Sequence, residues 1–173
     1  CTIKRNCTTN EGSAVNGTIT SRTAVGGGYS MGGLIGKTES TLNIEGTTET
    51  PISVQNINIR ETKHVNSTSN SYAGGVAGSA ASTNIQNVDV ENVRLAGKDL
   101  GGLIGCVNGG ADVKNVKISN SYLANCSEST DQRAVGGFFG IINGTFNGFN
   151  LLSKDNVIGY AEEDNKLLLY VSS

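Results

Sequence analysis

The sequence predicts an all-β fold, a parallel β-helix (β-solenoid) of about four to five three-stranded coils that wind to the right. Three observations support this fold. Gly, Asn, Ser and Thr make up 77 of the 173 residues, and these short side chains suit tight turns and thin strands better than helices. A glycine-rich motif recurs along the chain. Short runs of alternating apolar and polar residues, the period of a half-buried strand, follow its copies.

The glycine-rich motif is the clearest internal repeat. Each copy holds two adjacent glycines, then two residues that are mostly bulky and apolar, then a third glycine. The copies are Met31–Gly36, Ala73–Gly78, Leu100–Gly105 and Val135–Gly140. Paired glycines predict a close approach of two backbone segments, or a corner where a Cβ would clash. Self-similarity at this spacing is typical of repeat architectures, so we expect one coil for each copy.

A second element with a central asparagine follows the glycine motif. Its three better copies are Val54–Ile59, Ile85–Val90 and Val113–Ile118, with Asn56, Asn87 and Asn115 at their centres. Asn tolerates the left-handed backbone of sharp corners, so we expect these three asparagines to stack as a ladder along the coil axis. A degenerate fourth copy, Phe146–Leu151, has Gly148 in place of the asparagine.

The two elements together resemble the GLUG motif repeat. That repeat is found in bacterial and protist surface proteins, including adhesins of the filamentous-haemagglutinin type and the non-catalytic part of some immunoglobulin A peptidases. The resemblance covers Ala24 to Leu152. It implies an extracellular structural or adhesive role, and it carries no catalytic residues to this chain.

The ends of the chain depart from the repeat. We expect residues 1–23 to form a partial coil or cap, residues 24–152 the repeats, and residues 153–173 a cap or exchange strand, all within one domain. The chain begins at Cys1, which predicts a processed product or a piece of a longer chain. All four phenylalanines lie between 138 and 149, which favours a bulky terminal layer that closes the core.

An apolar run near the C-terminus has two interpretations. It comprises Leu167, Leu168, Leu169, Tyr170 and Val171. As a spare strand it would add to the incomplete first coil of another copy, and such a head-to-tail contact gives a filament. As a cap it would fold back over the last layer of its own chain. The expected partners are therefore other copies or neighbouring domains of a larger chain.

Four cysteines indicate an oxidising compartment, because their spacing fits no zinc motif and the chain has one histidine. They are Cys1, Cys7, Cys106 and Cys126. Four cysteines allow three pairings; proximity favours Cys1 with Cys7 and Cys106 with Cys126. Four free buried thiols are the alternative. We expect no metal site and no cofactor.

Five Asn-x-Ser/Thr sequons allow N-glycosylation in a eukaryotic source: Asn6, Asn16, Asn66, Asn125 and Asn143. Composition alone accounts for nearly this number. The net charge of −2 provides no basic surface for nucleic acid, and no apolar run approaches the length of a membrane span.

A few residues could carry chemistry. Asp89 and Glu91 share one outward strand face, and Asp112 near the equivalent corner could join them as hydrolytic carboxylates. Solvated strand faces opposite Lys114 and Lys117 are the simpler interpretation.

Other candidate residues are weaker. His64 is expected at the surface or a corner. Tyr29, Tyr72 and Tyr122 could stack on sugars or form core edges. Gly36-Lys37-Thr38 ends like a phosphate-binding loop but lacks the preceding glycine spacing.

The sequence therefore predicts a non-enzymatic, extracellular or cell-surface β-solenoid with a structural or adhesive role, such as a subunit of a surface filament or a segment of a larger surface protein. A carbohydrate-active or carbohydrate-binding β-helix is the alternative, with glycans as ligands.

Overall fold

The computed structural model describes residues 2–4, 14–20, 29–60, 70–125, 134–161 and 167–170, and side chains within 29–60, 70–125 and 134–159. In these residues every regular element is a β-strand, and the strands form one sheet of 13 and one of 4. All described strand pairs are parallel except the last one along the chain. The predicted all-β fold with parallel pairing is therefore confirmed.

Four repeats supply most of the strands. The first gives β3 (Ser30–Gly32), β4 (Ile35–Glu45) and β5 (Ile52–Arg60). The second gives β6 (Tyr72–Gly74), β7 (Ala77–Glu91) and β8 (Arg94–Gly97). The third gives β9 (Asp99–Gly101), β10 (Ile104–Val107), β11 (Ala111–Ser119) and β12 (Tyr122–Asn125). The fourth gives β13 (Val135–Gly136), β14 (Phe139–Ile142), β15 (Phe146–Lys154) and β16 (Val157–Ala161).

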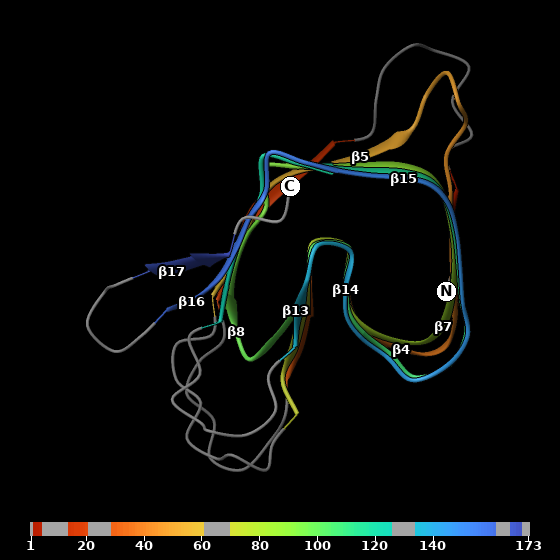
Figure 1. Cartoon of the computed structure of the whole chain (residues 1–173). Helices are drawn as coiled ribbons and strands as arrows, with labels where there is room; N and C mark the ends of the chain where they lie inside the picture. The colour runs from red at the N-terminus through yellow and green to blue at the C-terminus, as the bar shows by residue number, and fades with distance from the viewer. Residues whose placement is uncertain are drawn as a thin grey trace.

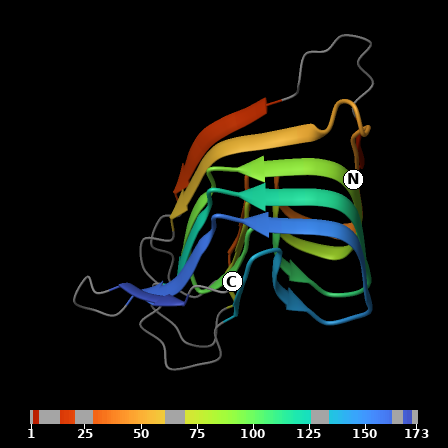
Figure 2. The same ribbon diagram turned by 45° about the horizontal axis from the view of Figure 1, so that its top comes forward.

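Equivalent strands of successive repeats pair in register. Strand β7 lies between β4 and β11, and β11 pairs in turn with β15. In the same way β8 lies between β5 and β12, and β12 pairs with β16. Figure 1 superimposes the repeats as one curled outline, and Figure 2 shows their strands as a stack. We call the strands of one repeat a layer.

The glycine motif forms a narrow fold-back, where the sequence predicts a single strand. Strands β13 and β14 run side by side in opposite directions in Figure 1. The first arm of each fold-back belongs to the small sheet β3–β6–β9–β13, and the second arm joins the large sheet. The third and fourth layers therefore hold four strands, whereas the sequence predicts three.

Close backbone contact explains the second glycine of each motif. A Cβ on Gly33 would lie 2.3 Å from the carbonyl oxygen of Gly75, and a Cβ on Gly75 would lie 2.4 Å from that of Gly102. Gly102 repeats the contact at 2.1 Å from the carbonyl oxygen of Gly137. The backbone N–H of Gly75 donates to Gly102 O at 3.2 Å. Of the two roles predicted for the paired glycines, the close approach is confirmed.

Left-handed asparagines make one row of corners. Asn87, Asn115 and Asn150 have φ angles of 55°, 52° and 53°. Asn115 Nδ2 donates to Asn87 Oδ1 at 3.0 Å, and Asn150 Nδ2 donates to Asn115 Oδ1 at 2.9 Å. The stacking of Asn87 on Asn115 is therefore confirmed. In the first layer the carbonyl oxygen of Gly46 takes this place, because it accepts from Asn87 Nδ2 at 2.8 Å.

Two assignments along this row are wrong. Asn56 belongs to a second row of corners with Asn92, whose Nδ2 donates to Asn56 Oδ1 at 2.6 Å. Gly148 is no corner but a residue of β15 that pairs with Val113. The error at Asn56 comes from Gly46, which lies 14 residues after Gly32 just as Asn115 lies 14 after Gly101, but has no side-chain amide to mark it. In the fourth copy the corner is Asn150, which lies 14 residues after Gly136.

A second row of corners lies further along each layer. It includes Asn56, Asn92 and Asn120, with φ angles of 56°, 50° and 52°, and Asp155 with φ 56°. These residues turn the chain between strands such as β11 and β12. Two left-handed corners in each of the second, third and fourth layers, and the turns at Gly46 and Asn56 in the first, bend the sheet into the curled outline of Figure 1.

Columns of inward-facing side chains form the core. The register stacks Ile44 on Ile85 and Ile85 on Val113, and their side chains are at most 2% exposed. Another column holds Ile59, Leu95 and Leu123. Because each column crosses successive layers, the core is continuous along the stack.

The chain ends add three strands. β1 (Thr2–Lys4) pairs with β4, and β2 (Ala14–Thr20) pairs with β5, so both extend the stack before the first layer. β17 (Leu167–Tyr170) lies antiparallel against β16 of the same chain. The spare strand predicted from Leu167 to Val171 is therefore wrong for the residues described, because this segment already has a partner strand.

The fourth layer also differs from its prediction. The repeat continues past residue 152, because β16 pairs with β12 just as β12 pairs with β8. Phe138 and Phe139 pack partly against the core, but Phe146 and Phe149 are 47% and 68% exposed. The four phenylalanines therefore do not close the end of the core.

Replacement of Asn115 tests the corner ladder. Asn115→Leu should lower the free energy of unfolding by about 3 kcal/mol, because it loses two amide hydrogen bonds and strains the left-handed backbone. Asn115→Gly keeps the backbone geometry and should cost only about 1 to 2 kcal/mol. Urea unfolding measures both. A loss below about 0.5 kcal/mol for the leucine variant would contradict the ladder.

Replacement of Gly102 tests the backbone contact. Gly102→Ala should cost about 2 to 3 kcal/mol, because a methyl group cannot fit against the Gly137 carbonyl. Gly110→Ala is the matched control, since its Cβ would meet only the Thr145 hydroxyl oxygen at 3.3 Å, and it should change stability by no more than about 0.5 kcal/mol. Equal thermal stability of the two variants is the result that our interpretation does not allow.

Candidate functional site

A shallow polar groove lies on the outer face of β4, β7 and β11. Side chains alternate between the two faces of a strand, so every second residue here points to solvent. The groove is lined by the side chains of Asn43, Glu45, Asn84, Gln86, Asp112 and Lys114, with the backbone of the buried Ile44 and Ile85 between them. The register arranges the side chains as two rows across the layers.

Each row is held by contacts between layers or within a strand. Asn84 Nδ2 donates to Asn43 Oδ1 at 2.9 Å, and Gln86 Nε2 donates to Glu45 Oε1 at 3.0 Å. On β11, Lys114 Nζ lies 3.4 Å from Asp112 Oδ1, and both side chains are about half exposed. The groove therefore presents amides, carboxylates and one ammonium in fixed positions, a set that can bind neutral polyols by hydrogen bonds.

The two rows continue onto β15, where sequence reasoning missed an aromatic residue. Asn147 follows Asp112 in register, and Phe149 follows Lys114. The Phe149 ring is 68% exposed beside the polar rows. An alignment on Asn150, 14 residues after Gly136, would have placed Phe149 on the outer face. Aromatic rings with neighbouring polar groups are common in ligand sites.

The three candidate carboxylates do not converge. Asp89 lies opposite Lys117 on β11, whereas Asp112 lies opposite Asn84, before the corner at Asn115. The expectation that Asp112 joins Asp89 and Glu91 is therefore wrong, because the corner separates the two strand faces. Burial raises the pKa of Asp89 above its ordinary 3.8; Lys117 opposes this and Glu91 adds to it. Lys114 pairs with Asp112, in agreement with a solvated strand face.

The tyrosines lie away from the groove. Tyr29 packs partly against the core, and Tyr122 is half-buried on β12. Burial raises the pKa of Tyr72 to about 12, with further contributions from Cys106 and Asp99. These surroundings fit the core-edge interpretation of Tyr72. His64 lies outside the described residues.

Cys106 is a free, fully buried thiol. Its Sγ contacts Asn108 Oδ1 at 3.6 Å, and burial raises its pKa, which a hydrogen bond from Tyr72 partly offsets. The predicted bond to Cys126 is thus not formed in the structure; Cys126, Cys1 and Cys7 lie outside the described residues. A buried neutral thiol is a poor nucleophile, so Cys106 packs as a small apolar side chain.

The sequons differ in accessibility. Asn143 is exposed, and its Nδ2 lies 3.4 Å from Asn108 Oδ1. Asn125 is fully buried and its Nδ2 donates to the carbonyl oxygen of Lys98, so the folded chain cannot present it for glycosylation. Asn6 and Asn66 lie outside the described residues, and so does the side chain of Asn16.

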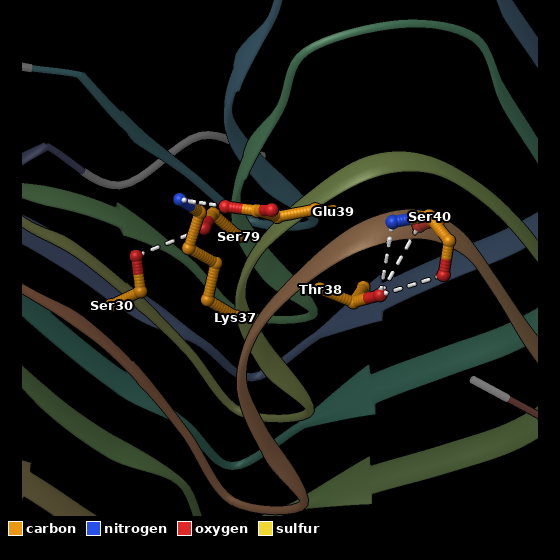
Figure 3. A network of polar contacts seen from close by, with 6 residues as sticks. All are labelled: Ser30, Lys37, Thr38, Glu39, Ser40 and Ser79. Atoms are coloured by element: carbon orange, nitrogen blue, oxygen red, sulfur yellow. Dashed lines mark hydrogen bonds and ion pairs between the residues drawn. The ribbon is translucent and has the colours of Figure 1, made fainter.

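The segment that ends like a phosphate-binding loop is part of a strand. Figure 3 shows Lys37 directed at Glu39, at 3.0 Å, and Thr38 bonded to Ser40. Ser30 and Ser79 join neighbouring layers beside them through hydroxyl groups 2.9 Å apart. Lys37 and Thr38 belong to β4, with no helix N-terminus to receive a phosphate.

Within the described ranges, no group of three or more His, Cys, Asp or Glu side chains is arranged to hold a metal ion. The same residues contain no helix long and apolar enough to cross a membrane. Comparisons of the chain with protein-family models, curated proteins and solved structures find no match. The function of the candidate site is therefore inferred from the geometry of its residues.

The raised pKa of Asp89 predicts a pH dependence of stability. The folded state holds the Asp89 proton more tightly than the unfolded chain, so ionisation of Asp89 costs stability. This cost is absent below the ordinary pKa of 3.8 and complete above the folded-state pKa. Asp89→Asn should therefore gain stability relative to the wild type between about pH 3 and pH 7. Urea unfolding at both pH values checks this, and a relative loss at pH 7 would be inconsistent with it.

The buried thiol predicts slow labelling. In the native protein, maleimide should leave the peptide that contains Cys106 unmodified, whereas unfolding in urea should expose it. Peptide mapping by mass spectrometry without reductant reads the modification directly. Rapid native labelling, or a disulfide between Cys106 and Cys126, would show that the described position of the thiol is wrong.

Proposed function

We propose that the chain is a non-enzymatic β-solenoid module with a structural or adhesive role at a cell surface or in the extracellular space. The observation that carries the proposal is the in-register stacking of four layers through parallel strands, glycine contacts and asparagine corners. Such stacks make rigid rods, because each layer contacts its neighbours along the full strand length. A right-handed winding is part of the proposal.

The resemblance to the GLUG motif repeat supports the location. The glycine motif and the asparagine element are the two parts of that resemblance, and here they supply the fold-back and the corner of each layer. The family's surface proteins imply an extracellular setting and neighbouring domains of a larger chain as partners. The accessible sequon at Asn143 is compatible with glycosylation there.

The separation of the carboxylates supports a role without catalysis. Glycoside hydrolysis needs two carboxyl groups on opposite sides of one bond. Asp89 and Asp112 lie on different strand faces, and Asp112 is engaged by Lys114. A polysaccharide held at Asp112 would therefore not meet Asp89.

Carbohydrate binding is a second candidate, and the polar groove favours it. Its rows repeat across the layers at the strand spacing of about 4.8 Å. Amides and carboxylates at that interval, next to the exposed ring of Phe149, suit an extended polysaccharide that lies along the stack. If the module adheres to glycans, carbohydrate binding and the adhesive role are the same function.

Polysaccharide assays test the two roles. The purified chain should release no new reducing ends from a panel of polysaccharides, and turnover that Asp89→Asn abolishes would refute the non-enzymatic role. If the groove binds glycans, Phe149→Ala and Gln86→Ala should weaken binding to a retained polysaccharide severalfold. Asn58→Ala, an exposed position on β5 outside the groove, is the matched control. Equal loss in all three variants would exclude the groove as the binding surface.

A further inference from the structure

Within the described residues no strand lies beyond β15, so the core of the fourth layer is open at this end. One inward column runs through Leu42, Thr83, Ala111 and Phe146, and its first three members are at most 2% exposed, whereas Phe146 is 47% exposed. The Phe146 ring meets Phe139 edge-on at 5.6 Å, which covers one side of the ring. A residue position that is buried in three layers is thus exposed in the last.

The opposite end of the stack is covered. Strand β1 pairs with β4 and β2 pairs with β5, and the inward residues Leu42 and Ile44 of the first layer are buried. The two ends therefore differ: one carries added strands, and the other presents an uncovered apolar layer.

The backbone of β15 is open on the same side. Ala111 N donates to Thr145 O, and successive residues of a strand direct their backbone groups to alternate sides, so the N–H groups of Phe146 and Gly148 point away from β11. Among the described strands β15 pairs with β11 alone, while β17 occupies the outer edge of β16. The corner ladder also stops here, because the exposed Asn150 Oδ1 accepts no hydrogen bond within the described residues.

We infer that the outer edge of β15 binds a second copy of this chain through its N-terminal strand β1, in parallel and in the register of the intrachain layers. The argument is continuity: β1 already pairs with β4 as the layer that precedes it, with Thr2 opposite Asn43 and Lys4 opposite Glu45, and β1 is the end strand of the described sheet path. The same register on β15 places Thr2 opposite Asn147 and Lys4 opposite Phe149.

This contact is heterologous, because it joins the last layer of one copy to the first strands of another. It adds main-chain hydrogen bonds to Phe146 and Gly148 and covers the Phe146 ring. Such a joint repeats without closing unless the rotation happens to close a ring, so the product is a linear stack of chains. The inference deepens the proposed structural role and rests on it.

Sedimentation velocity of the full chain, up to roughly 1 mM, tests the assembly. The expected result is growth of the average mass with concentration from the single-chain 17.9 kDa to at least twice that value. Amine cross-linking of an equal mixture of ¹⁴N- and ¹⁵N-labelled chains should yield mixed-label links between Lys4 and Lys114. A chain that stays monomeric throughout this range overturns the inference.

Two variants of β15 and a matched control locate the joint. Phe146→Lys places a charge in the open interior, and Gly148→Pro removes an outward N–H; both should reduce the average mass to the single-chain value. Leu152→Lys makes the same change from an apolar residue to lysine at a half-exposed position of the same strand, outside the residues that β1 would face, and should assemble like the wild type. Circular dichroism confirms that each variant is folded.

The outcomes separate this inference from the proposed function. Assembly that survives Phe146→Lys and Gly148→Pro, or is lost equally in Leu152→Lys, places the joint elsewhere and overturns the inference. If either edge variant fails to fold, the mixed-label links in the wild type decide: their presence supports the joint and their absence overturns it. Polysaccharide cleavage overturns the proposed function instead, whatever the mass.

Discussion

The left-handed asparagine corner is the interaction on which the rest of the layered structure depends. Asn115 holds a φ of 52° that few residues tolerate, and its amide bonds to Asn87 on one side and Asn150 on the other. A layer displaced by one residue would break both hydrogen bonds and turn the buried column of Ile85 and Val113 toward solvent. The corners therefore set the register, and the register places the core.

The glycine fold-back adds a constraint on spacing between layers. Because Gly75 and Gly102 touch backbone to backbone, the turns of neighbouring fold-backs pack in direct backbone contact. The next residues along the chain, Val76 and Leu103, are fully buried there. The outer row varies from Glu45 to Gln86 and Lys114, while the adjacent core column stays apolar, with Ile44, Ile85 and Val113.

The sequence predicts much of this arrangement, because the repeated motifs identify residues that occupy the same position in successive layers. The alternation of Ala111 with Val113, and of Val116 with Ile118, identifies inward residues on the two sides of a corner, and Asn87 and Asn115 identify the corner itself. The errors arise in the first and fourth copies. Gly46 takes the corner position of the first layer without an asparagine side chain to mark it, so the pattern places Asn56 in the wrong row. In the fourth copy the pattern of Phe146–Leu151 points to Gly148, whereas the left-handed residue is Asn150.

The candidate site was less predictable, because it depends on which side chains adjoin across layers. The repeat pattern places Asp112 and Asp89 near equivalent corners, yet the corner lies between their strand segments and separates the two side chains. In the sequence Phe149 resembles a core residue, because other phenylalanines lie near it. Alignment of the repeats on Asn150 instead of Gly148 places Phe149 on the outer face of β15. The exposure of Phe146 arises because its strand is the last of the stack, and no local sequence pattern reports that position.

A double-mutant cycle between Asn115 and Asn150 tests the central claim most directly, namely that amide bonds between corners hold the layers in register. Glycine at each position keeps the left-handed backbone and removes only the amides. Equilibrium unfolding of the wild type, Asn115→Gly, Asn150→Gly and the double variant should give a coupling energy of about 1 kcal/mol. A coupling energy indistinguishable from zero would mean that the corners act independently and that the ladder does not hold the layers together.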